Sequence, residues 1–308
     1  MTMLRTLFSC GAALAAAATV CAQGLPPVQS GRLERLADFP SRFVDARHVD
    51  VWLPEGYSSA GRCQVLYMHD GQMLFDGANT WNRQGWQVDV PLARLMREGR
   101  VPCTLVVGIH NTGIWRHSEY FPQKFLRHVS PTFRSSFEAE YLRNKPQADN
   151  YLRFIVEELK PAIDRRYATL PGRAHTFVMG SSMGGAISVY AMNEYPQVFG
   201  GAAGLSLAWV GMGKANFELP LAAFDYLRDH LAPPAGHRLY MDHGDGDMDA
   251  WFGNYQAFVD EIVRDKGYTA AHWQTLRFPG TGHSERDWAA RLEAPLEFLL
   301  RAPAESAH

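Results

Sequence analysis

The sequence predicts an α/β fold with a mostly parallel central sheet, helices on both faces and an insertion around residues 111–147. Strand-like and helix-like patterns alternate along most of the 308 residues, as in chains built from strand–helix–strand units. The runs VLYM, TLVVGI and TFVM are apolar without alternation, which is typical of strands buried on both sides. With 46 % hydrophobic and 20 % charged residues, the composition is that of an ordinary globular domain.

The strand candidates are short runs rich in β-branched and aromatic residues. They span 43–53, 64–69, 104–109, 175–180, 200–206, 238–242 and 273–278. The helix candidates show a 3.6-residue apolar period. They span 87–98, 148–163, 183–194, 218–231, 250–266 and 285–300. The pattern therefore predicts crossover helices between parallel strands.

The stretch 111–147 interrupts this alternation. It shows little periodicity and is dense in aromatic and basic residues. Because a long segment without clear elements is uncommon inside a compact domain, we interpret it as a lid or binding insertion.

The first 22 residues have the pattern of a cleavable signal peptide. Arg5 precedes an apolar stretch at about 7–20, and small residues close the segment before Gln23. A lipid anchor on Cys21 is the alternative, although Val20 is bulkier than such a site favours. The apolar stretch is short for a membrane span, so we expect a secreted or periplasmic protein without stable membrane insertion.

The remaining chain reads as one domain. We expect an N-terminal tether at 23–41, the catalytic domain at 42–302 and a tail at 303–308. The formal net charge of −2 comes without a long basic or acidic run, which argues against nucleic acid and anionic membranes as partners. The sequence does not determine the oligomeric state.

Two cysteines, Cys63 and Cys103, remain after the predicted cleavage, and each lies just ahead of a strand candidate. If those strands are parallel neighbours, the two thiols lie at the same edge of the sheet and can form a disulfide in an oxidising compartment. The alternative is a pair of buried free thiols.

The motif GSSMGG at 180–185 lies between an apolar strand candidate and a long helix candidate. A nucleophilic serine stands on a sharp strand-to-helix turn that crowds the residues two before and two after it. Gly180 and Gly184 occupy those places around Ser182, and the Met183 N–H is then one oxyanion donor. A tight turn with glycines for close packing is the alternative. A phosphate loop is disfavoured because no lysine follows the glycines.

A nucleophilic serine needs a base, and the base needs an orienting acid. His283 follows the last strand candidate and a glycine-rich turn, which makes it the predicted base. The acid is expected on the preceding loop, where Asp249 is favoured and Asp247 is the alternative. A calcium loop fits poorly, because Ala250 and Gln256 stand where such a loop needs glycine and glutamate.

Seven motifs then point to a known family. They are VLYMHDGQMLFD (65–76), GWQVD (85–89), VVGIHNTG (106–113), SEYFP (118–122), GSSMGG (180–185), YMDHG (240–244) and GTGHSERDW (280–288). Over about residues 42–300 the chain resembles the esterase-D-type branch of the α/β-hydrolases, with its feruloyl and acetylxylan esterases, enterobactin esterases, S-formylglutathione hydrolases and mycolyltransferase antigens.

The resemblance implies an α/β-hydrolase fold with Ser182 as nucleophile and His283 as base. It also implies that the loop HDGQ supplies the second oxyanion donor, the Gln72 N–H. The residues that it places along the substrate cleft are Asp70, Trp86 and Trp288. The alternatives are a turn-forming role for the aspartate and core packing for the tryptophans.

These observations predict a serine carboxylic-ester hydrolase that works through an acyl-enzyme and needs no cofactor or metal. Feruloyl, acetyl-sugar and siderophore-type esters are the candidate substrates, either as small molecules or linked to carbohydrate. One alternative is an acyltransferase that passes the acyl group to a sugar alcohol. Another is a non-catalytic binding protein on a hydrolase scaffold.

Overall fold

The computed structural model describes residues 24–211 and 215–302. The predicted signal peptide at 1–22, with the alternative anchor site Cys21, and the predicted tail at 303–308 lie outside the described residues. In the described part of the chain, no helix is long and apolar enough to cross a bilayer.

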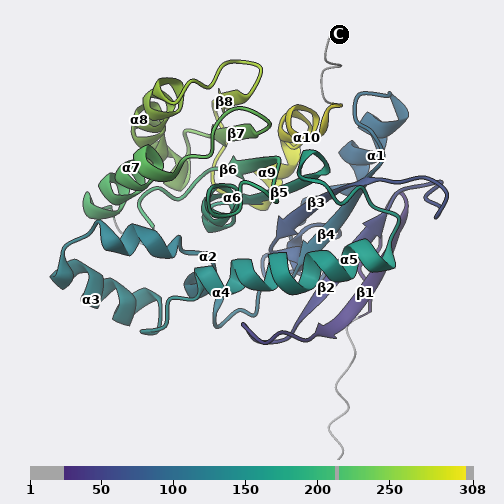
Figure 1. Cartoon of the computed structure of the whole chain (residues 1–308), viewed down its shortest axis with the longest axis horizontal. Coiled ribbons are helices and arrows are strands. Elements are labelled where there is room, and N and C mark those ends of the chain that lie inside the picture. The colour runs from purple at the N-terminus through teal and green to yellow at the C-terminus, as the bar shows by residue number, and fades with distance from the viewer. Residues whose placement is uncertain (1–23, 212–214, 303–308) are drawn as a thin grey trace, which may run out of the picture.

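An eight-stranded sheet with the order β1-β2-β4-β3-β5-β6-β7-β8 forms the centre of the molecule (Figure 1). Strands β3 to β8 run parallel, whereas β2 pairs antiparallel with both β1 and β4. The strands are β1 Arg32–Phe39, β2 Arg47–Leu53, β3 Gln64–His69, β4 Thr104–Ile109, β5 Thr176–Ser181, β6 Gly201–Leu205, β7 Arg238–His243 and β8 Trp273–Arg277. The predicted mostly parallel sheet is confirmed.

Helices cover both faces of this sheet. They are α1 Asp89–Arg97, α2 Arg116–Tyr120, α3 Pro131–Tyr141, α4 Ala148–Arg153, α5 Lys160–Arg166, α6 Met183–Glu194, α7 Glu218–His230, α8 Phe252–Asp265, α9 Glu285–Ala290 and α10 Glu293–Leu300. A π-helical stretch, Phe154–Leu159, joins α4 to α5 into the single helix that the sequence predicts. The C-terminal helix, predicted as one unit, is divided into α9 and α10.

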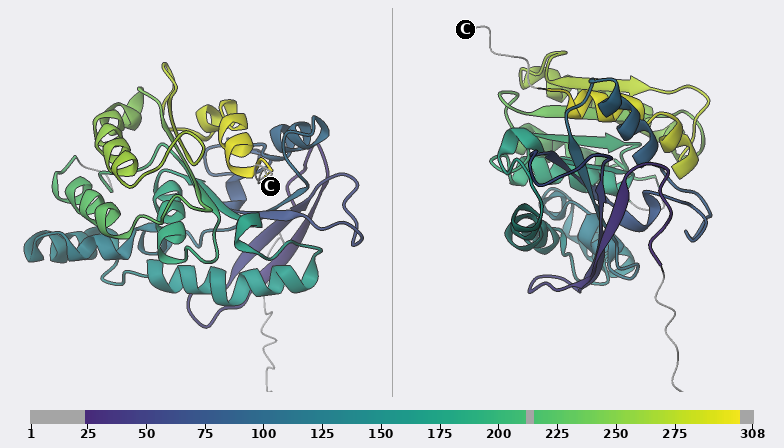
Figure 2. Two further views of the ribbon diagram at one scale, coloured as in Figure 1. Left: turned by 45° about the horizontal axis from the view of Figure 1, so that its top comes forward. Right: turned by 90° about the vertical axis from the view of Figure 1, so that its right-hand side faces the viewer.

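Two apolar layers hold the helices against the sheet. Successive side chains of β3 belong to different layers, because Val65 and Tyr67 pack on one face while Leu66 and Met68 pack on the other. Helices α4 to α8 contribute to the first layer, and α1, α9 and α10 contribute to the second (Figure 2). Strands buried on both faces explain the apolar runs in the sequence.

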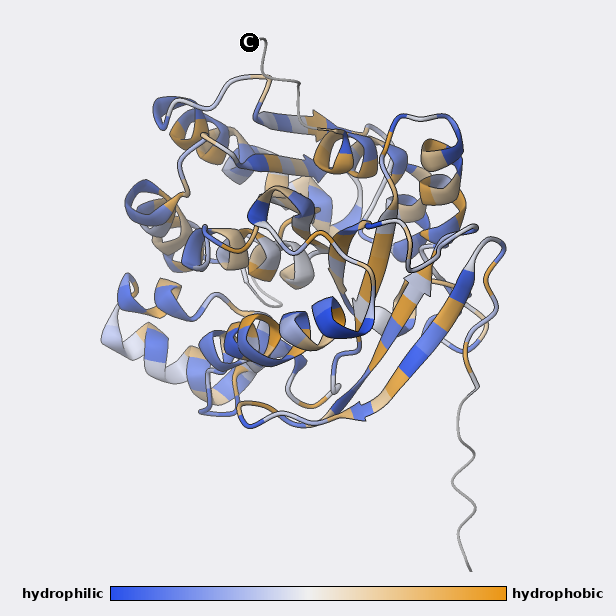
Figure 3. Cartoon of the chain, turned by 45° about the vertical axis from the view of Figure 1, so that its right-hand side comes forward, coloured by the Kyte–Doolittle hydropathy of each residue, from blue (hydrophilic) through white to orange (hydrophobic). Residues whose placement is uncertain are grey.

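Strand β1, Arg32–Phe39, corrects the predicted domain limits. The segment 23–41 is expected as a tether, but eight of its residues form the edge strand of the sheet, paired with β2. Hydrophilic and hydrophobic segments alternate along the strands at this edge (Figure 3), and every residue of β1 is exposed or half-buried. Because β1 is polar and lies at the edge, its composition resembles that of a tether.

The insertion at 111–147 also differs from the expectation of a segment without clear elements. It holds α2, a 3-10 helix at Gln123–Arg127 and α3. Its aromatic side chains Phe121, Phe125 and Phe137 are buried, and the ring of Phe121 contacts those of the other two. Each of these helices has only a few turns, so its apolar pattern repeats too few times to stand out in the sequence.

The predicted disulfide between Cys63 and Cys103 is present, with 4.7 Å between the Cα atoms. Strands β3 and β4 are parallel neighbours with Gln64 opposite Thr104, which brings the residues just before the two strands together. The disulfide lies at the edge of the sheet where the parallel strands begin.

Candidate active site

Three loops carry the predicted catalytic residues to the opposite edge of the sheet, where the parallel strands end. Ser182 follows β5, Asp249 lies in a 3-10 helix after β7, and His283 follows β8. Parallel strands all end at one edge, so residues far apart in sequence meet there. Ser182 and His283 line the same cleft, whose volume is about 670 Å³.

Ser182 has the strained backbone of a nucleophile turn. Its φ is 54° and its ψ is −122°, a conformation that residues other than glycine rarely adopt. The Ser182 N–H donates to the carbonyl oxygen of Leu205 at 2.8 Å, and Ala186 N–H donates to the Ser182 carbonyl at 3.1 Å. Helix α6 begins directly after the serine. The local chain therefore turns from strand to helix at one residue.

The two glycines around this serine have different surroundings. A Cβ at Gly180 would lie 2.6 Å from the carbonyl carbon and oxygen of Gly184. A Cβ at Gly184 would meet the His69 Cβ at 3.4 Å and the Asp70 Oδ2 at 3.6 Å, which is ordinary van der Waals contact. The crowding predicted for both positions is therefore found at Gly180 and not at Gly184.

This difference predicts unequal effects of alanine at the two positions. Gly180→Ala should destabilise the fold by about 1–3 kcal/mol and lower the ester hydrolysis that the sequence predicts, because backbone on both sides of the turn must shift. Gly184→Ala serves as the matched control and should leave both nearly unchanged, since its methyl group fits. Urea unfolding and initial rates on a chromogenic ester measure the two effects. Equal losses would contradict the steric explanation.

The structure joins His283 to Asp249 rather than to the alternative, Asp247. The His283 Nδ1 and the Asp249 Oδ1 are 2.7 Å apart, and the aspartate side chain is fully buried. Asp247 is exposed, and its Oδ2 lies beside Gly282. The ring of Phe252 packs edge-on against the imidazole, as the ring of Trp288 does.

Asp249 is held in its ionised form. Burial raises the pKa of this carboxyl, but hydrogen bonds from His283, the Ser206 hydroxyl and the Gly244 N–H outweigh burial and leave the pKa below its ordinary value. An ionised acid that accepts a hydrogen bond from Nδ1 leaves the Nε2 of the imidazole to act as a base. Among the described residues, no hydrogen bond joins His283 to Ser182, and such bonds often tighten only when substrate binds.

Two backbone amides near Ser182 are free to donate. Gln72 lies in the 3-10 helix Gly71–Met73 after β3, and Met183 is the first residue of α6. Neither N–H donates to another of the described residues. The Gln72 side chain accepts a hydrogen bond from the Asn111 N–H at 3.1 Å, which ties this loop to the end of β4. The arrangement offers two donors to a developing oxyanion.

Asp70 lines the cleft, but its carboxylate already has partners. Arg116 pairs with it in a bidentate contact, with both nitrogen–oxygen distances at 2.7 Å, and Asn111 Nδ2 donates to it at 2.6 Å. Burial raises the pKa of Asp70, and Arg116 outweighs burial, so the pKa lies below its ordinary value. Asp70 also has a φ of 55°, consistent with the turn-forming alternative. Sequence reasoning missed Arg116 as its partner.

Trp86 and Trp288 also line the cleft. Their ring centroids are 5.8 Å apart, and the residues are only 4 % and 5 % exposed. Both belong to the apolar layer that includes α1 and α10. Core packing, the alternative interpretation, thus accounts for most of the surface of both tryptophans, and both also line the cleft.

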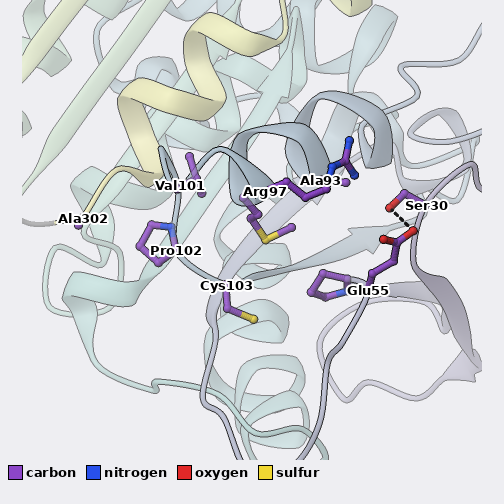
Figure 4. Close-up of a pocket in the computed structure, with 11 residues that line it drawn as sticks. Ser30, Glu55, Ala93, Arg97, Val101, Pro102, Cys103 and Ala302 are labelled. Atoms are coloured by element: carbon purple, nitrogen blue, oxygen red, sulfur yellow. Dashed lines mark hydrogen bonds between the residues drawn. The ribbon is translucent and has the colours of Figure 1, made fainter.

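A second hollow of about 450 Å³ lies where the parallel strands begin (Figure 4). Arg97, Glu55 and Cys103 are among the residues that line it, and no histidine is among them. The Ser30 hydroxyl in this hollow donates to the Glu55 carboxylate at 3.2 Å, but no histidine lies beside it to serve as the base of a serine triad. The cleft beside Ser182 is the candidate active site, because it brings a serine on a strained turn together with a histidine that contacts a buried aspartate.

Comparisons with known proteins agree with this geometry. The family model "Esterase", described as "Putative esterase", matches residues 41–299. Two Bacillus subtilis proteins, "Uncharacterized protein YbbA" and "Uncharacterized protein YjcH", are each 24 % identical, over 50 % and 56 % of this chain. The aligned regions span 54 % and 60 % of those two proteins, so the chain matches little more than half of their length.

Solved structures share the fold. A ferulic acid esterase matches with a TM-score of 0.63 and 18 % identity, over 87 % of this chain and 97 % of that one. An IroE-like serine hydrolase from Shewanella oneidensis matches with a TM-score of 0.64 and 18 % identity, over 87 % and 79 %. The enterobactin esterase FES from Shigella flexneri matches with a TM-score of 0.63 and 15 % identity, over 88 % and 60 %. These likenesses establish the α/β-hydrolase fold.

Proposed function

We propose that this chain, which belongs to the Esterase family, is a serine hydrolase of carboxylic esters with Ser182, His283 and Asp249 as its catalytic triad. The observation that carries this proposal is the 2.7 Å contact between the His283 Nδ1 and the buried Asp249 Oδ1 in the cleft that also holds the strained Ser182. A histidine oriented in this way presents its other nitrogen to the cleft.

In the proposed cycle, the Ser182 Oγ attacks the ester carbonyl while the His283 Nε2 takes the hydroxyl proton. The Met183 and Gln72 N–H groups stabilise the oxyanion, and the N-terminal end of the twelve-residue α6 adds its positive potential. His283 then gives its proton to the leaving alkoxide. Water, deprotonated by His283, attacks the acyl-enzyme and releases the acid. This cycle requires no cofactor.

The cleft favours a neutral ester that carries a ring. Trp81 on its rim is 84 % exposed, and the amide side chains of Asn82 and Gln84 stand beside it. An exposed indole can stack on an aromatic acyl group or on a sugar ring. Arg116 is neutralised by its ion pair with Asp70, and Glu285 adds a negative charge to the lining. We therefore propose feruloyl or acetyl-sugar esters over anionic, siderophore-type esters.

Trp81→Ala tests the ring-binding part of this proposal. The substitution should raise KM for a feruloyl or acetylated-sugar ester about three- to tenfold and leave kcat nearly unchanged, because stacking stabilises substrate and transition state alike. Phe258→Ala is the matched control, since Phe258 is 60 % exposed on α8 and does not line the cleft. An unchanged KM for every ring-bearing ester would exclude Trp81 from binding.

Labelling with an organophosphonate tests the triad itself. The reagent should form one covalent adduct, located at Ser182 by peptide mass spectrometry, and should stop the hydrolysis of p-nitrophenyl esters. An adduct at another residue, or hydrolysis that continues after complete labelling of Ser182, would contradict the proposal. Product analysis with and without a sugar acceptor distinguishes hydrolysis from acyl transfer.

We also propose that the protein is exported and then cleaved after residue 22. The sequence of residues 1–22 and the disulfide between Cys63 and Cys103 support this, because structural disulfides are characteristic of oxidising compartments. The mass of the mature protein from its host tests the cleavage site.

A further inference from the structure

A buried serine, Ser206, lies at the centre of a hydrogen-bond network behind the proposed triad. It follows β6, is fully buried and has a φ of 47°. Its hydroxyl oxygen accepts hydrogen bonds from Trp288 Nε1 at 2.9 Å and from Arg291 Nη2 at 2.7 Å. The same hydroxyl donates to the Oδ2 of Asp249, the oxygen that does not contact His283.

The two donors fix the direction of the Ser206 proton. A serine hydroxyl has one proton and two lone pairs, and Trp288 and Arg291 together occupy both lone pairs. The single proton is then left to point at Asp249. Without hydrogen bonds from Trp288 and Arg291, the Ser206 hydroxyl would be free to rotate, and its proton would no longer be held toward Asp249. Arg291 thus acts on the acid through Ser206, in addition to the direct ion pair between its Nη2 and the Asp249 Oδ2 at 3.7 Å.

Arg291 is itself held rigidly. Its side chain is 2 % exposed, its Nη2 contacts the buried Asp242 Oδ1 at 2.9 Å, and its Nη1 donates to Thr281 Oγ1 at 2.7 Å. Asp242 also accepts from the Ser206 N–H at 3.2 Å. A buried ion pair is commonly no more stable than apolar residues of similar volume, so stability alone does not explain this one. The orientation that this ion pair gives to the neighbouring groups explains it.

The carboxylate of Asp249 consequently has a different set of partners at each oxygen. Oδ1 contacts His283, while Oδ2 accepts from the Ser206 hydroxyl and from the Gly244 N–H at 2.7 Å. Rotation of the carboxylate would break both contacts at Oδ2. The network therefore holds Oδ1 in the plane that meets the imidazole.

We propose that Ser206 and Arg291 are positioning residues of the esterase reaction: Arg291 orients the Ser206 hydroxyl, which locks the Asp249 carboxylate against His283. Neither residue is among those that line the cleft. The proposal rests on the proposed triad, in which Asp249 is the acid.

Removal of the Ser206 hydroxyl gives the first test. Ser206→Ala should lower kcat about tenfold, the scale of one lost hydrogen bond to a charged group, with KM changed less than about twofold. Ser118→Ala is the matched control, because Ser118 is also buried, its hydroxyl donates to the Leu142 carbonyl, and neither residue lines the cleft. An unchanged kcat in Ser206→Ala would overturn the positioning role.

A double-mutant cycle separates positioning from a general structural effect. If Ser206 acts through Asp249, Ser206→Ala should have almost no further effect on kcat in an Asp249→Asn background. A tenfold loss in both backgrounds would show that Ser206 acts independently of the acid and would overturn the proposal. If Asp249→Asn by itself leaves kcat unchanged, the proposed triad fails, and the positioning role fails with it.

Arg291 needs a variant that keeps the fold. Arg291→Met alone leaves the Asp242 carboxylate buried without its cation and can unfold the protein. The double variant Asp242→Asn/Arg291→Met removes both charges and keeps an amide oxygen for the Ser206 N–H. It should unfold near the wild-type urea midpoint, with kcat lowered about tenfold and KM nearly unchanged. A folded double variant with wild-type kcat would overturn the role of Arg291.

Discussion

Ser182→Ala should lower kcat for ester hydrolysis by at least about a thousandfold, because it removes the hydroxyl carried by the strained turn in the cleft that His283 also lines. Substrate binding and the fold should change little. Alanine adopts a φ of 54° about as unfavourably as serine does, and the turn is held by backbone contacts to Leu205 and Ala186. Initial rates on p-nitrophenyl acetate, with urea unfolding measured in parallel, give both quantities.

The neighbouring serine provides the matched control for this prediction. Ser181 is the last residue of β5, is 5 % exposed and lines the same cleft, directly before the proposed nucleophile in the same motif. Ser181→Ala removes a hydroxyl one residue away and should keep activity within a few fold of wild type. If Ser182→Ala retains turnover, or if both variants lose it equally, the hydroxyl of Ser182 is not the nucleophile.

The regular elements could be predicted because burial leaves a clear pattern. Strands β3 and β4 coincide with the predicted ranges 64–69 and 104–109, since both are buried along their whole length and read as continuous apolar runs. Strand β1 could not be predicted in the same way. Four of its eight residues are charged, and its strand character depends on pairing with β2, which no local pattern reports.

The proposed nucleophile, Ser182, and the proposed base, His283, are predicted from chain order and from the turn chemistry around them, and the structure places both in one cleft. The acid could not be assigned as firmly. Asp247 and Asp249 are two residues apart on one loop, and the backbone between them decides which one faces the imidazole: Asp247 has a φ of 49° and an exposed side chain, whereas Asp249 is buried.

Partners that come from distant segments gave no signal in the sequence. Arg116 contacts Asp70 from 46 residues away, and Arg291 reaches Ser206 from 85 residues away. A single arginine in a helix or loop has the same local appearance whether it is solvated or buried against a carboxylate. Only the fold, by bringing the ends of β3, β6 and the C-terminal helices together, distinguishes these cases.

Asp249→Asn should lower kcat by about a hundred- to ten-thousandfold, the range found when the acid of a serine triad loses its charge. The amide fills the same volume but can place an N–H donor against the His283 Nδ1, where the carboxylate only accepts. The imidazole then takes the tautomer that carries its proton on Nε2, so it cannot accept the proton of Ser182. KM should change little, because Asp249 is not among the residues that line the cleft beside the nucleophile.

Asp247→Asn makes the same chemical change two residues earlier on the same loop. Its side chain is exposed and makes no hydrogen bond to His283, so kcat should stay within about twofold of wild type. Steady-state rates on one p-nitrophenyl ester, measured for both variants across pH 6 to 9, compare them directly. A large loss in Asp247→Asn with a mild loss in Asp249→Asn would reverse the assignment. Equal mild losses in the two variants would mean that His283 works without a fixed acid. The ring contacts of Phe252 and Trp288 would then be enough to hold the imidazole in place.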